Sequence, residues 1–390
     1  MKKRTDESAF VGRKLRLARS FHGFTQQELA DAIGITHSWI GHAEAGQKAP
    51  SAELLAALSE QLGFKEHFFF TPLVDEFLDE DCYFRSRKTT KMAARNQALA
   101  QGTLFSLILN HISTIAPLKK DNIPEISATT KEEIERAADY CRNYWDLGAD
   151  RPVMSMTRLA EVLCHAIVIR LDGNDKIDAF SRGAGRHKII VVNEKKGATR
   201  TRFDIAHELG HLVMHRGMDP DDESKEKSAD SFASALLMPR VSFLREFPKM
   251  HGLDWPALFE FKRRWGASLA AILYRARDLE KITATQYLQA CKYISWKRWN
   301  KVEPQEPPVE EPELLKLMFN HLAANLNTRP FEIADELGYE DHIFEKVTGI
   351  SVDRPPKTGG RVAEILSIES LRERKAGLHK PQNTNSGVDR

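Results

Sequence analysis

The hydrophobic pattern of the first seventy residues predicts four short helices separated by turn residues. Leu15, Leu17 and Ala18 mark the apolar face of the first helix. Thr25 precedes the second helix, and Glu28, three residues later, completes the sequence signature of a capping box. The turn and cap residues that bound the third and fourth helices are Gly34, Thr36, Gly46 and Ser51.

Strand signals are confined to the middle of the chain. Three runs rich in β-branched residues, separated by turns that contain glycine, lie at 166–170, 176–180 and 188–193. Two helices are expected to follow, at 202–215 and 224–238, and Pro239 ends the second of them. Residues 73–150 have a polar, helical pattern that includes one basic cluster, which is either a solvated face or a nucleic-acid contact (Arg85, Arg87, Lys88, Lys91 and Arg95).

Length and composition fit a soluble protein of several domains. The chain has 390 residues, of which 42% are hydrophobic and 29% charged, and its formal net charge is +2. Whole-chain charge therefore argues neither for nor against a nucleic-acid partner. No apolar run approaches the ~18 residues of a membrane span, and the N-terminus lacks the apolar stretch of a signal peptide. The four cysteines form no CxxC pair, which excludes a cysteine-based zinc module and suits a reducing compartment, so we expect a cytoplasmic protein with no membrane partner.

Residues 207–211 have the sequence HELGH and fall on a predicted helix. Two histidines four positions apart lie on the same side of a helix, so both imidazoles of His207 and His211 can reach one metal ion. Glu208 lies beside them, where a carboxylate can accept a proton from water. This spacing predicts a catalytic zinc site, which needs three protein ligands and one open position.

A third ligand is expected from the following helix. Glu226 and Asp230 form an ExxxD pair, in which Glu226 supplies the ligand and Asp230, one turn later, can accept the other N–H of a ligating histidine. His215 could donate to the oxyanion of a transition state, or it could be a helix C-terminal histidine stabilised by the helix dipole. The competing third ligands are Glu223, Asp219 and Asp222.

These residues carry a specific resemblance. The segments RFDIAHELGHL (202–212), ADSFA (229–233) and LLMP (236–239) resemble the ImmA/IrrE family of metallopeptidases, and the similarity covers about 150–290. It implies a zincin-like fold with a small antiparallel sheet against the HExxH helix, zinc held by two histidines and a glutamate, and cleavage of helix-turn-helix repressors. The strand at 188–193 is either the edge strand that binds substrate or an interior strand.

Residues 10–65 resemble a Cro/repressor-type helix-turn-helix module of the XRE family, on the segments TQQELA (25–30), IGI (33–35) and EAG (44–46). The resemblance implies that the helix at about 36–44 enters the major groove of DNA. The expected polar contacts to DNA are Gln26, His37, Ser38 and His42, and the expected phosphate contacts are Lys2, Lys3, Arg4, Arg13 and Lys14. The alternative is a helix-turn-helix fold used only for protein contact.

Together these observations predict a multidomain, mainly α-helical protein with an α+β zincin-like metallopeptidase core and an N-terminal all-α helix-turn-helix domain. We expect a homodimer that binds a double-stranded DNA operator and uses Zn²⁺ to cleave a repressor-type protein, a partner or a copy of itself. One alternative is a transcription factor whose zinc domain senses a ligand or stabilises the fold without proteolysis, and another is an antitoxin-like DNA-binding module. The expected segments are 1–72, helix-turn-helix domain; 73–150, helical connector; 151–245, metallopeptidase domain; 246–302, its helical extension; 303–312, a Pro/Glu linker or brace; 313–370, C-terminal helical domain; and 371–390, disordered tail.

Overall fold

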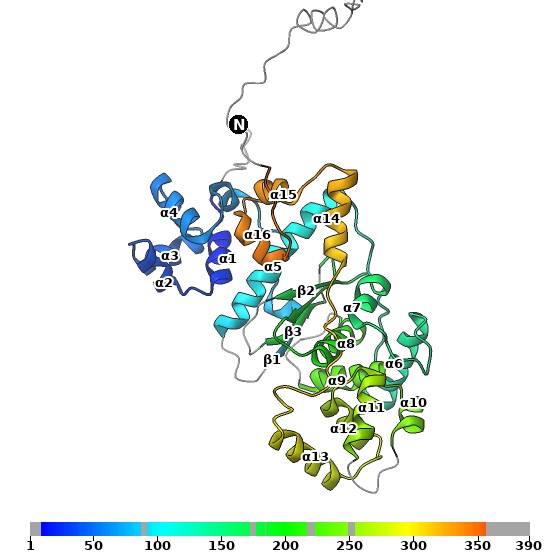
Figure 1. The fold of residues 1–390 in the computed structure, drawn as a ribbon. Coiled ribbons are helices and arrows are strands. Elements are labelled where there is room, and N and C mark those ends of the chain that lie inside the picture. Colours follow the sequence, from blue (N-terminus) through cyan, green and yellow to red (C-terminus); the bar gives the residue numbers. More distant parts are fainter. Residues whose placement is uncertain are drawn as a thin grey trace, which may run out of the picture. The chain divides into compact units, whose positions relative to one another are not determined.

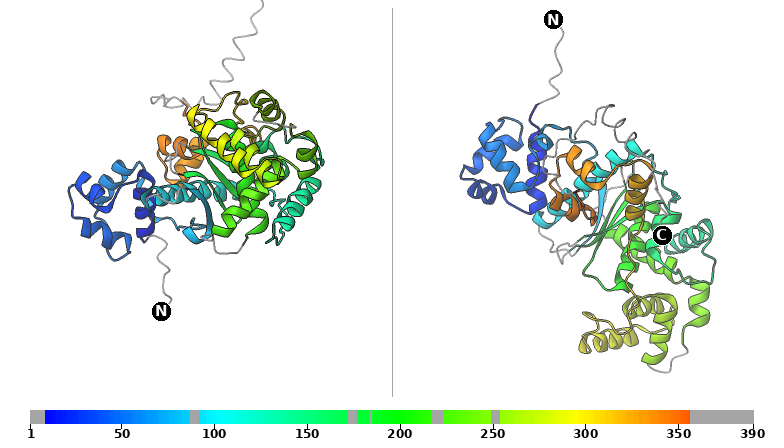
Figure 2. Two further views of the ribbon diagram at one scale, coloured as in Figure 1. Left: turned by 90° about the horizontal axis from the view of Figure 1, so that it is seen from below. Right: turned by 45° about the horizontal axis from the view of Figure 1, so that its top comes forward.

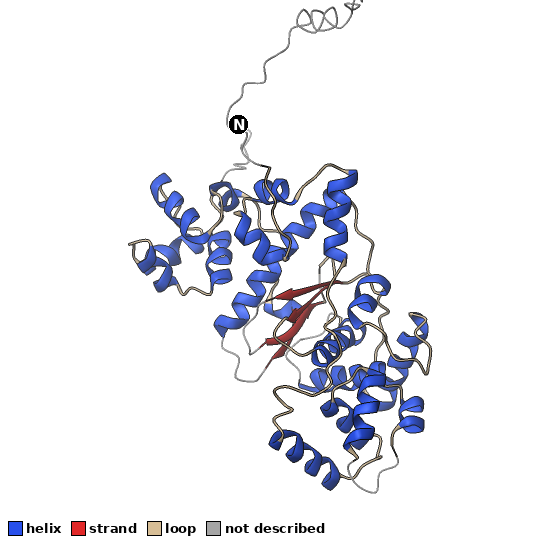
Figure 3. Ribbon diagram, in the orientation of Figure 1, coloured by secondary structure: helices blue, strands red, loops and turns tan. Residues whose placement is uncertain are grey.

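A four-stranded mixed sheet lies between two layers of helices (Figure 3). The structure, a computed structural model, describes residues 9–86, 92–171, 177–183, 185–216, 223–248 and 254–355. The chain divides into two units, 1–352 and 353–390, and every element below belongs to the first. The strands, in their order across the sheet, are β1 (Cys82–Ser86), β3 (Ile177–Arg182), β4 (Ile189–Asn193) and β2 (Ile167–Leu171).

The three strands predicted from sequence are confirmed to within two residues, but two expectations about the sheet are wrong. The connector was expected to be helical, yet it contributes β1, which pairs antiparallel with β3. The sheet was expected to be antiparallel, whereas β2 and β4 run parallel, joined by a crossover that contains β3. A parallel pair needs such a long connection, and the short turns in the sequence gave no sign of it.

Strand β4 is an interior strand, so of the two possibilities for 188–193, a substrate-binding edge strand or an interior strand, the second is confirmed. It is paired on both sides, with β3 and with β2, and all five of its residues are buried. Its side chains alternate between two cores, because successive residues of a strand point to opposite faces. Ile190 and Val192 belong to one core, and Ile189 and Val191 belong to the other.

The first core lies between the sheet and the helices of the predicted metallopeptidase part (Figure 1). The two helices expected at 202–215 and 224–238 are present as α8 and α9, and α8 begins four residues earlier than predicted. The elements on this side are α6 (Lys131–Tyr144), α7 (Met156–Arg158), a π-helical turn (Leu159–Leu163), α8 (Ala198–Met214), α9 (Glu223–Leu237), α10 (Arg240–Glu246), α11 (Trp255–Trp265), α12 (Leu269–Asp278) and α13 (Ala284–Trp296).

The second core joins the opposite face of the sheet to both ends of the described chain (Figure 2). Helix α5 (Met92–Ile115) lies along this face, and the N-terminal and C-terminal helices pack around it. These elements are α1 (Gly12–His22), α2 (Gln26–Ala32), α3 (His37–Glu44), α4 (Ala52–Leu62), two 3₁₀ turns (Glu66–Phe70 and Asp79–Asp81), α14 (Leu314–Asn325), α15 (Pro330–Leu337) and α16 (Asp341–Thr348).

The C-terminal helices are bound directly to the N-terminal ones. Phe64 and Tyr339 form an isolated β-bridge with their rings 5.4 Å apart, and the Tyr339 hydroxyl donates to the carbonyl of Leu104 at 3.0 Å. The pKa of Tyr339 is raised well above its usual value by burial, which keeps this hydroxyl protonated. Residues 314–348 thus share one core with α1–α5. The expected disordered tail lies outside the described residues.

The segment 303–312 is a brace held by its glutamates. Glu306 accepts hydrogen bonds from the Thr199 backbone N–H and hydroxyl, at 2.8 and 2.7 Å, at the start of α8. Glu310 accepts from the Thr157 N–H at 2.8 Å and forms an ion pair with the buried Arg202. These bonds fix the N-terminal turn of α8, which carries the HExxH motif.

The predicted helix-turn-helix is built by side-chain caps and one close glycine contact. Thr25 and Glu28 form the predicted capping box at the start of α2, and the Thr36 hydroxyl caps α3. Gly12 lets the first turn of α1 touch the end of α3. A Cβ at this position would overlap the carbonyl oxygen of Ala43 and lie 2.7 Å from that of Glu44.

Gly12→Ala is therefore expected to lower the free energy of unfolding by at least about 2 kcal/mol, because the added carbon meets backbone that cannot move aside. The matched control is Gly41→Ala on α3, where an added Cβ would meet only the Gln26 side chain at 3.6 Å. Urea denaturation of the two variants measures the difference. Equal midpoints would contradict the proposed contact between α1 and α3.

Candidate metal centre and DNA-binding surface

Helices α8 and α9 bring the three expected ligand residues to one point. His207 and His211 lie on the same side of α8, and Glu226 reaches them from the first turns of α9. Gly210 makes this close packing possible, since a Cβ there would lie 3.0 Å from the Phe232 ring of α9. All three ligand atoms lie within 4.8 Å of one another.

The donor geometry fits a small tetrahedral cation. The Nε2 atoms of His207 and His211 are 3.0 Å apart, and they lie 3.4 and 3.1 Å from the two carboxylate oxygens of Glu226. Ligands about 2.0–2.2 Å from a tetrahedral zinc ion are about 3.3 Å from each other, so these distances suit zinc. The Glu226 side chain stays 35% exposed, so solvent reaches the donors.

Hydrogen bonds at Nδ1 of His207 and His211 direct the Nε2 lone pair of each ring at the expected metal position. His207 Nδ1 lies 2.9 Å from Asp230 Oδ1, and a carboxylate accepts a hydrogen bond from the ring N–H. Burial lowers the pKa of His211 to about 3, despite the nearby carboxylate of Glu226. A neutral imidazole is the form that binds metal.

His215 extends this arrangement by one layer. The Ser228 hydroxyl donates to the Lys225 carbonyl at 2.9 Å, so its oxygen accepts from His215 Nε2–H, also at 2.9 Å. His215 Nδ1 is then unprotonated and accepts from His211 Nδ1–H at 3.0 Å. Both ring nitrogens of His215 take part in this arrangement, and its two predicted roles, donor to an oxyanion and helix C-terminal histidine, stay predictions. His215 thereby contacts the Nδ1 side of the His211 ring.

Two groups near the centre come from strands and carry no sequence signal. Tyr83 of β1 stacks on the His211 ring, with centroids 4.6 Å apart and planes 11° apart, and its hydroxyl donates to the His215 carbonyl. Ser181 of β3 donates to Glu208 Oε2 at 2.6 Å, and both residues are fully buried. Glu208 is thereby held beside the three expected ligand residues and is not one of them.

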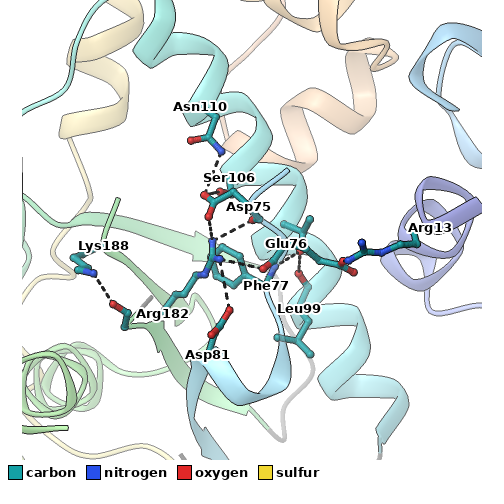
Figure 4. A network of polar contacts seen from close by, with 12 residues as sticks. Arg13, Asp75, Glu76, Phe77, Asp81, Leu99, Ser106, Asn110, Arg182 and Lys188 are labelled. Atoms are coloured by element: carbon teal, nitrogen blue, oxygen red, sulfur yellow. Dashed lines mark hydrogen bonds and ion pairs between the residues drawn. The ribbon is translucent and has the colours of Figure 1, made fainter. Parts of the chain in front are cut away.

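Arg182, the next residue on β3, points to the opposite face of the sheet and joins it to the N-terminal helices (Figure 4). Its guanidinium donates to the carbonyls of Asp75 and Glu76, both at 3.1 Å, and forms an ion pair with Asp75 at 2.7 Å. Glu76 in turn forms an ion pair with Arg13 of α1. Ser181 therefore contacts Glu208 on one face of the sheet. Arg182 contacts Asp75 and Glu76 on the other face, and Glu76 is paired with α1.

We expect Asp230→Asn to weaken zinc affinity by roughly 10–100-fold and Ser228→Ala by about tenfold, because Asp230 contacts the ligand His207 directly and Ser228 contacts His211 through His215. Competition with a chromogenic chelator measures both affinities. Ser228→Thr keeps the hydroxyl and should restore wild-type affinity. Ser231→Ala is the matched control, since among the described residues this serine bonds only to the Lys227 carbonyl one turn away. Equal affinities of Ser228→Ala and Ser231→Ala would contradict the proposed chain.

The alternative third ligands cannot be compared with Glu226 in the described part of the chain. Asp219 and Asp222 lie outside the described residues, as does the side chain of Glu223. In the basic cluster, Arg95 forms an ion pair with Asp79, and the other four side chains are not described.

Some of the predicted DNA-contacting side chains are exposed, and others make hydrogen bonds within the protein. His37 and Ser38, in the first turn of α3, are exposed. Gln26 donates to Glu44 at 2.8 Å, and His42 contacts Gln47 at 2.6 Å. Lys2, Lys3 and Arg4 lie outside the described residues.

Lys14 cannot be a phosphate contact, contrary to prediction. Its side chain is 3% exposed, with the ammonium 4.1 Å from the Phe68 ring centroid. Burial lowers the pKa of Lys14 to about 8. Arg13 is exposed, but its guanidinium is paired with Glu76. Counting charges in the sequence treats every lysine as solvated. Lys14 is buried because it packs against Phe68, which is distant from it in the sequence.

Comparisons with known proteins match two separate parts of the chain. Residues 11–67 match a helix-turn-helix domain, and residues 163–277 match an IrrE N-terminal-like domain. None of the described helices is long and apolar enough to cross a bilayer.

Two regulators of Bacillus subtilis (strain 168) are similar to a short part of the chain. An uncharacterized HTH-type transcriptional regulator, YazB, is 36% identical over 56 residues, which are 14% of this chain and 81% of that protein. The SPbeta prophage-derived uncharacterized HTH-type transcriptional regulator YonR is 36% identical over 70 residues, 18% of this chain and 65% of that protein. The chain thus spans just under two thirds of YonR.

Two solved structures show only a distant likeness. A Mycobacterium tuberculosis transcriptional regulator is 14% identical with a TM-score of 0.28, over 44% of this chain and 51% of that one. The apo form of the competence regulator ComR from Streptococcus vestibularis is 10% identical with a TM-score of 0.16, over 95% of this chain and 99% of that one.

Proposed function

Since the chain belongs to the helix-turn-helix transcriptional regulators and carries an IrrE N-terminal-like domain, we propose that it is a zinc-dependent endopeptidase that cleaves a repressor-type protein, a partner or a copy of itself, to switch gene expression. The observation that carries this proposal is the position of Glu208. Its carboxylate is buried, oriented by Ser181, and adjacent to three metal-ligand side chains. A structural or sensing metal site has no need of such a group.

The residues divide the proposed reaction among them. His207, His211 and Glu226 would hold zinc, which supplies a Lewis acid that polarises an amide carbonyl and lowers the pKa of water. Glu208 accepts the proton of the attacking water and passes it to the leaving amine. Ser181 keeps the Glu208 carboxylate in one orientation through both transfers.

Operator binding would rest on α3 and on basic residues before α1. His37 and Ser38 lie where the first turn of a recognition helix meets base edges. Helix α3 contains no lysine or arginine, so phosphate affinity would come from Lys2, Lys3 and Arg4 and from a homodimer that doubles the contacts.

The test is direct cleavage. Zinc-loaded full-length protein is incubated with the repressor-type proteins encoded beside its gene, and with itself alone, in the presence and absence of operator DNA. We expect one substrate to yield a defined pair of fragments by mass spectrometry, and a chelator to abolish the cut. If every candidate stays intact while the protein retains zinc and binds DNA, the metal domain acts as a sensor or structural module instead.

A further inference from the structure

The segment from Lys281 to Val302 is strongly basic in a chain that is otherwise nearly neutral. It holds five cations (Lys281, Lys292, Lys297, Arg298 and Lys301) and no aspartate or glutamate, whereas the whole chain has a net charge of only +2. All five are exposed, and within the described part of the chain none of them has an ion-pair partner. Glu303, which follows, is directed at Lys262 at 3.1 Å.

Aromatic rings lie among these cations at the end of α13. Trp296 is 71% exposed, and its ring lies 5.6 Å from that of Tyr293, which stacks on Trp255 at 4.6 Å. The Lys297 ammonium lies 4.6 Å from the Trp296 ring centroid. We call Lys292, Tyr293, Trp296, Lys297, Arg298 and Lys301 the basic–aromatic patch. In this patch the exposed Trp296 indole lies against Tyr293 and among cations that have no ion-pair partner in the described part of the chain.

This combination selects among polyanionic partners. A membrane surface would favour a continuous apolar face, but exposed Lys292 lies between Leu288 and Trp296 on the same side of α13. Duplex DNA offers phosphates to the cations, but its bases are already stacked on each other. Single-stranded DNA offers both phosphates and unstacked bases, and proteins that bind it combine basic side chains with aromatic stacking platforms.

We propose that the basic–aromatic patch binds single-stranded DNA, with a base stacked on Trp296 and phosphates on the surrounding cations. The patch lies beyond residues 163–277, which match the IrrE N-terminal-like domain, and on other helices than the helix-turn-helix. The interaction is independent of the proposed proteolysis, so Glu208→Gln and metal-free protein should bind single strands as the wild type does.

The experiment measures fluorescence anisotropy of a labelled oligothymidine of about sixteen nucleotides against the full chain at low salt. Trp296→Ala is expected to weaken binding at least fivefold, since stacking of one base contributes about that much or more. Lys297→Ala/Lys301→Ala is expected to lower the slope of log affinity against log salt by about 1.4, or 0.7 for each phosphate contact. Leu288→Ala on the same helix and His37→Ala on α3 should leave both quantities unchanged.

Three results would overturn the proposal. They are no binding by the wild type, equal affinities of the wild type and the two patch variants, and binding of phosphatidylserine vesicles, rather than oligothymidine, that depends on Trp296. Thermal melting of each variant confirms that it is folded; the replaced side chains are exposed, so melting temperatures should match the wild type. Unlabelled oligothymidine should compete better than a duplex of the same length.

Discussion

Glu208→Gln is expected to reduce substrate cleavage by about 10²–10⁴-fold while leaving zinc content and DNA affinity near wild type. Glutamine keeps the size of the side chain and an oxygen that can accept from Ser181, but it cannot take a proton from water. General base catalysis alone contributes this range of rate enhancement. Fragment yield against time, with zinc measured on the same samples, separates loss of the base from loss of the metal.

Glu161→Gln provides the matched control for this substitution. Glu161 is also a buried glutamate of the core, where it accepts a hydrogen bond from the Glu313 N–H at 3.0 Å, and the glutamine oxygen can replace that acceptor. Its cleavage rate should equal that of the wild type. If Glu208→Gln cleaves at the wild-type rate, or relieves repression in cells as well as the wild type does, Glu208 is not the base and proteolysis is not the switch.

His211→Ala is expected to abolish zinc retention, from about one ion per chain to none. The substitution removes one of three protein donors and also the ring on which Tyr83 stacks. Zinc at a hundred times its dissociation constant stabilises a protein by about 2.7 kcal/mol, so added zinc should raise the melting temperature of the wild type and not of the variant. Elemental analysis after gel filtration measures the stoichiometry.

His321→Ala controls for the loss of any histidine. His321 is exposed on α14 and contacts only Asn325 at 3.0 Å among the interactions described. Its zinc content and zinc-dependent stabilisation should match the wild type. Full zinc retention by both His211→Ala and His207→Ala would contradict the donor set, whatever their catalytic activity.

Local spacing accounts for the parts of the metal centre that sequence could predict. His207 and His211 depend only on the repeat of one helix, and Glu226 and Asp230 on the repeat of the next. Tyr83 and Ser181 reach the same point from β1 and β3, more than 90 residues apart in the chain. No periodicity connects residues that meet through sheet pairing, so these two could not be found.

The same reason explains the errors in the fold. Strand β1 has a short, mixed sequence (CYFRS) between polar segments, and only its pairing with β3 makes it a strand. Strand propensity depends mainly on the neighbours that a segment finds in the sheet. The helices and their caps depend on neighbours within four residues, and they were predicted well.

The contact between the N-terminal and C-terminal parts of the described chain restricts how this protein can evolve. Phe64 and Phe68 are buried, and Tyr339 covers part of both rings. A gene recombined after residue 72 would therefore encode a helix-turn-helix domain without the Tyr339 side chain that covers these rings. Exchange of the whole DNA-binding module would require both ends of the gene to be replaced together. New operator specificity is therefore more accessible through point substitutions on the exposed side of α3 than through domain shuffling.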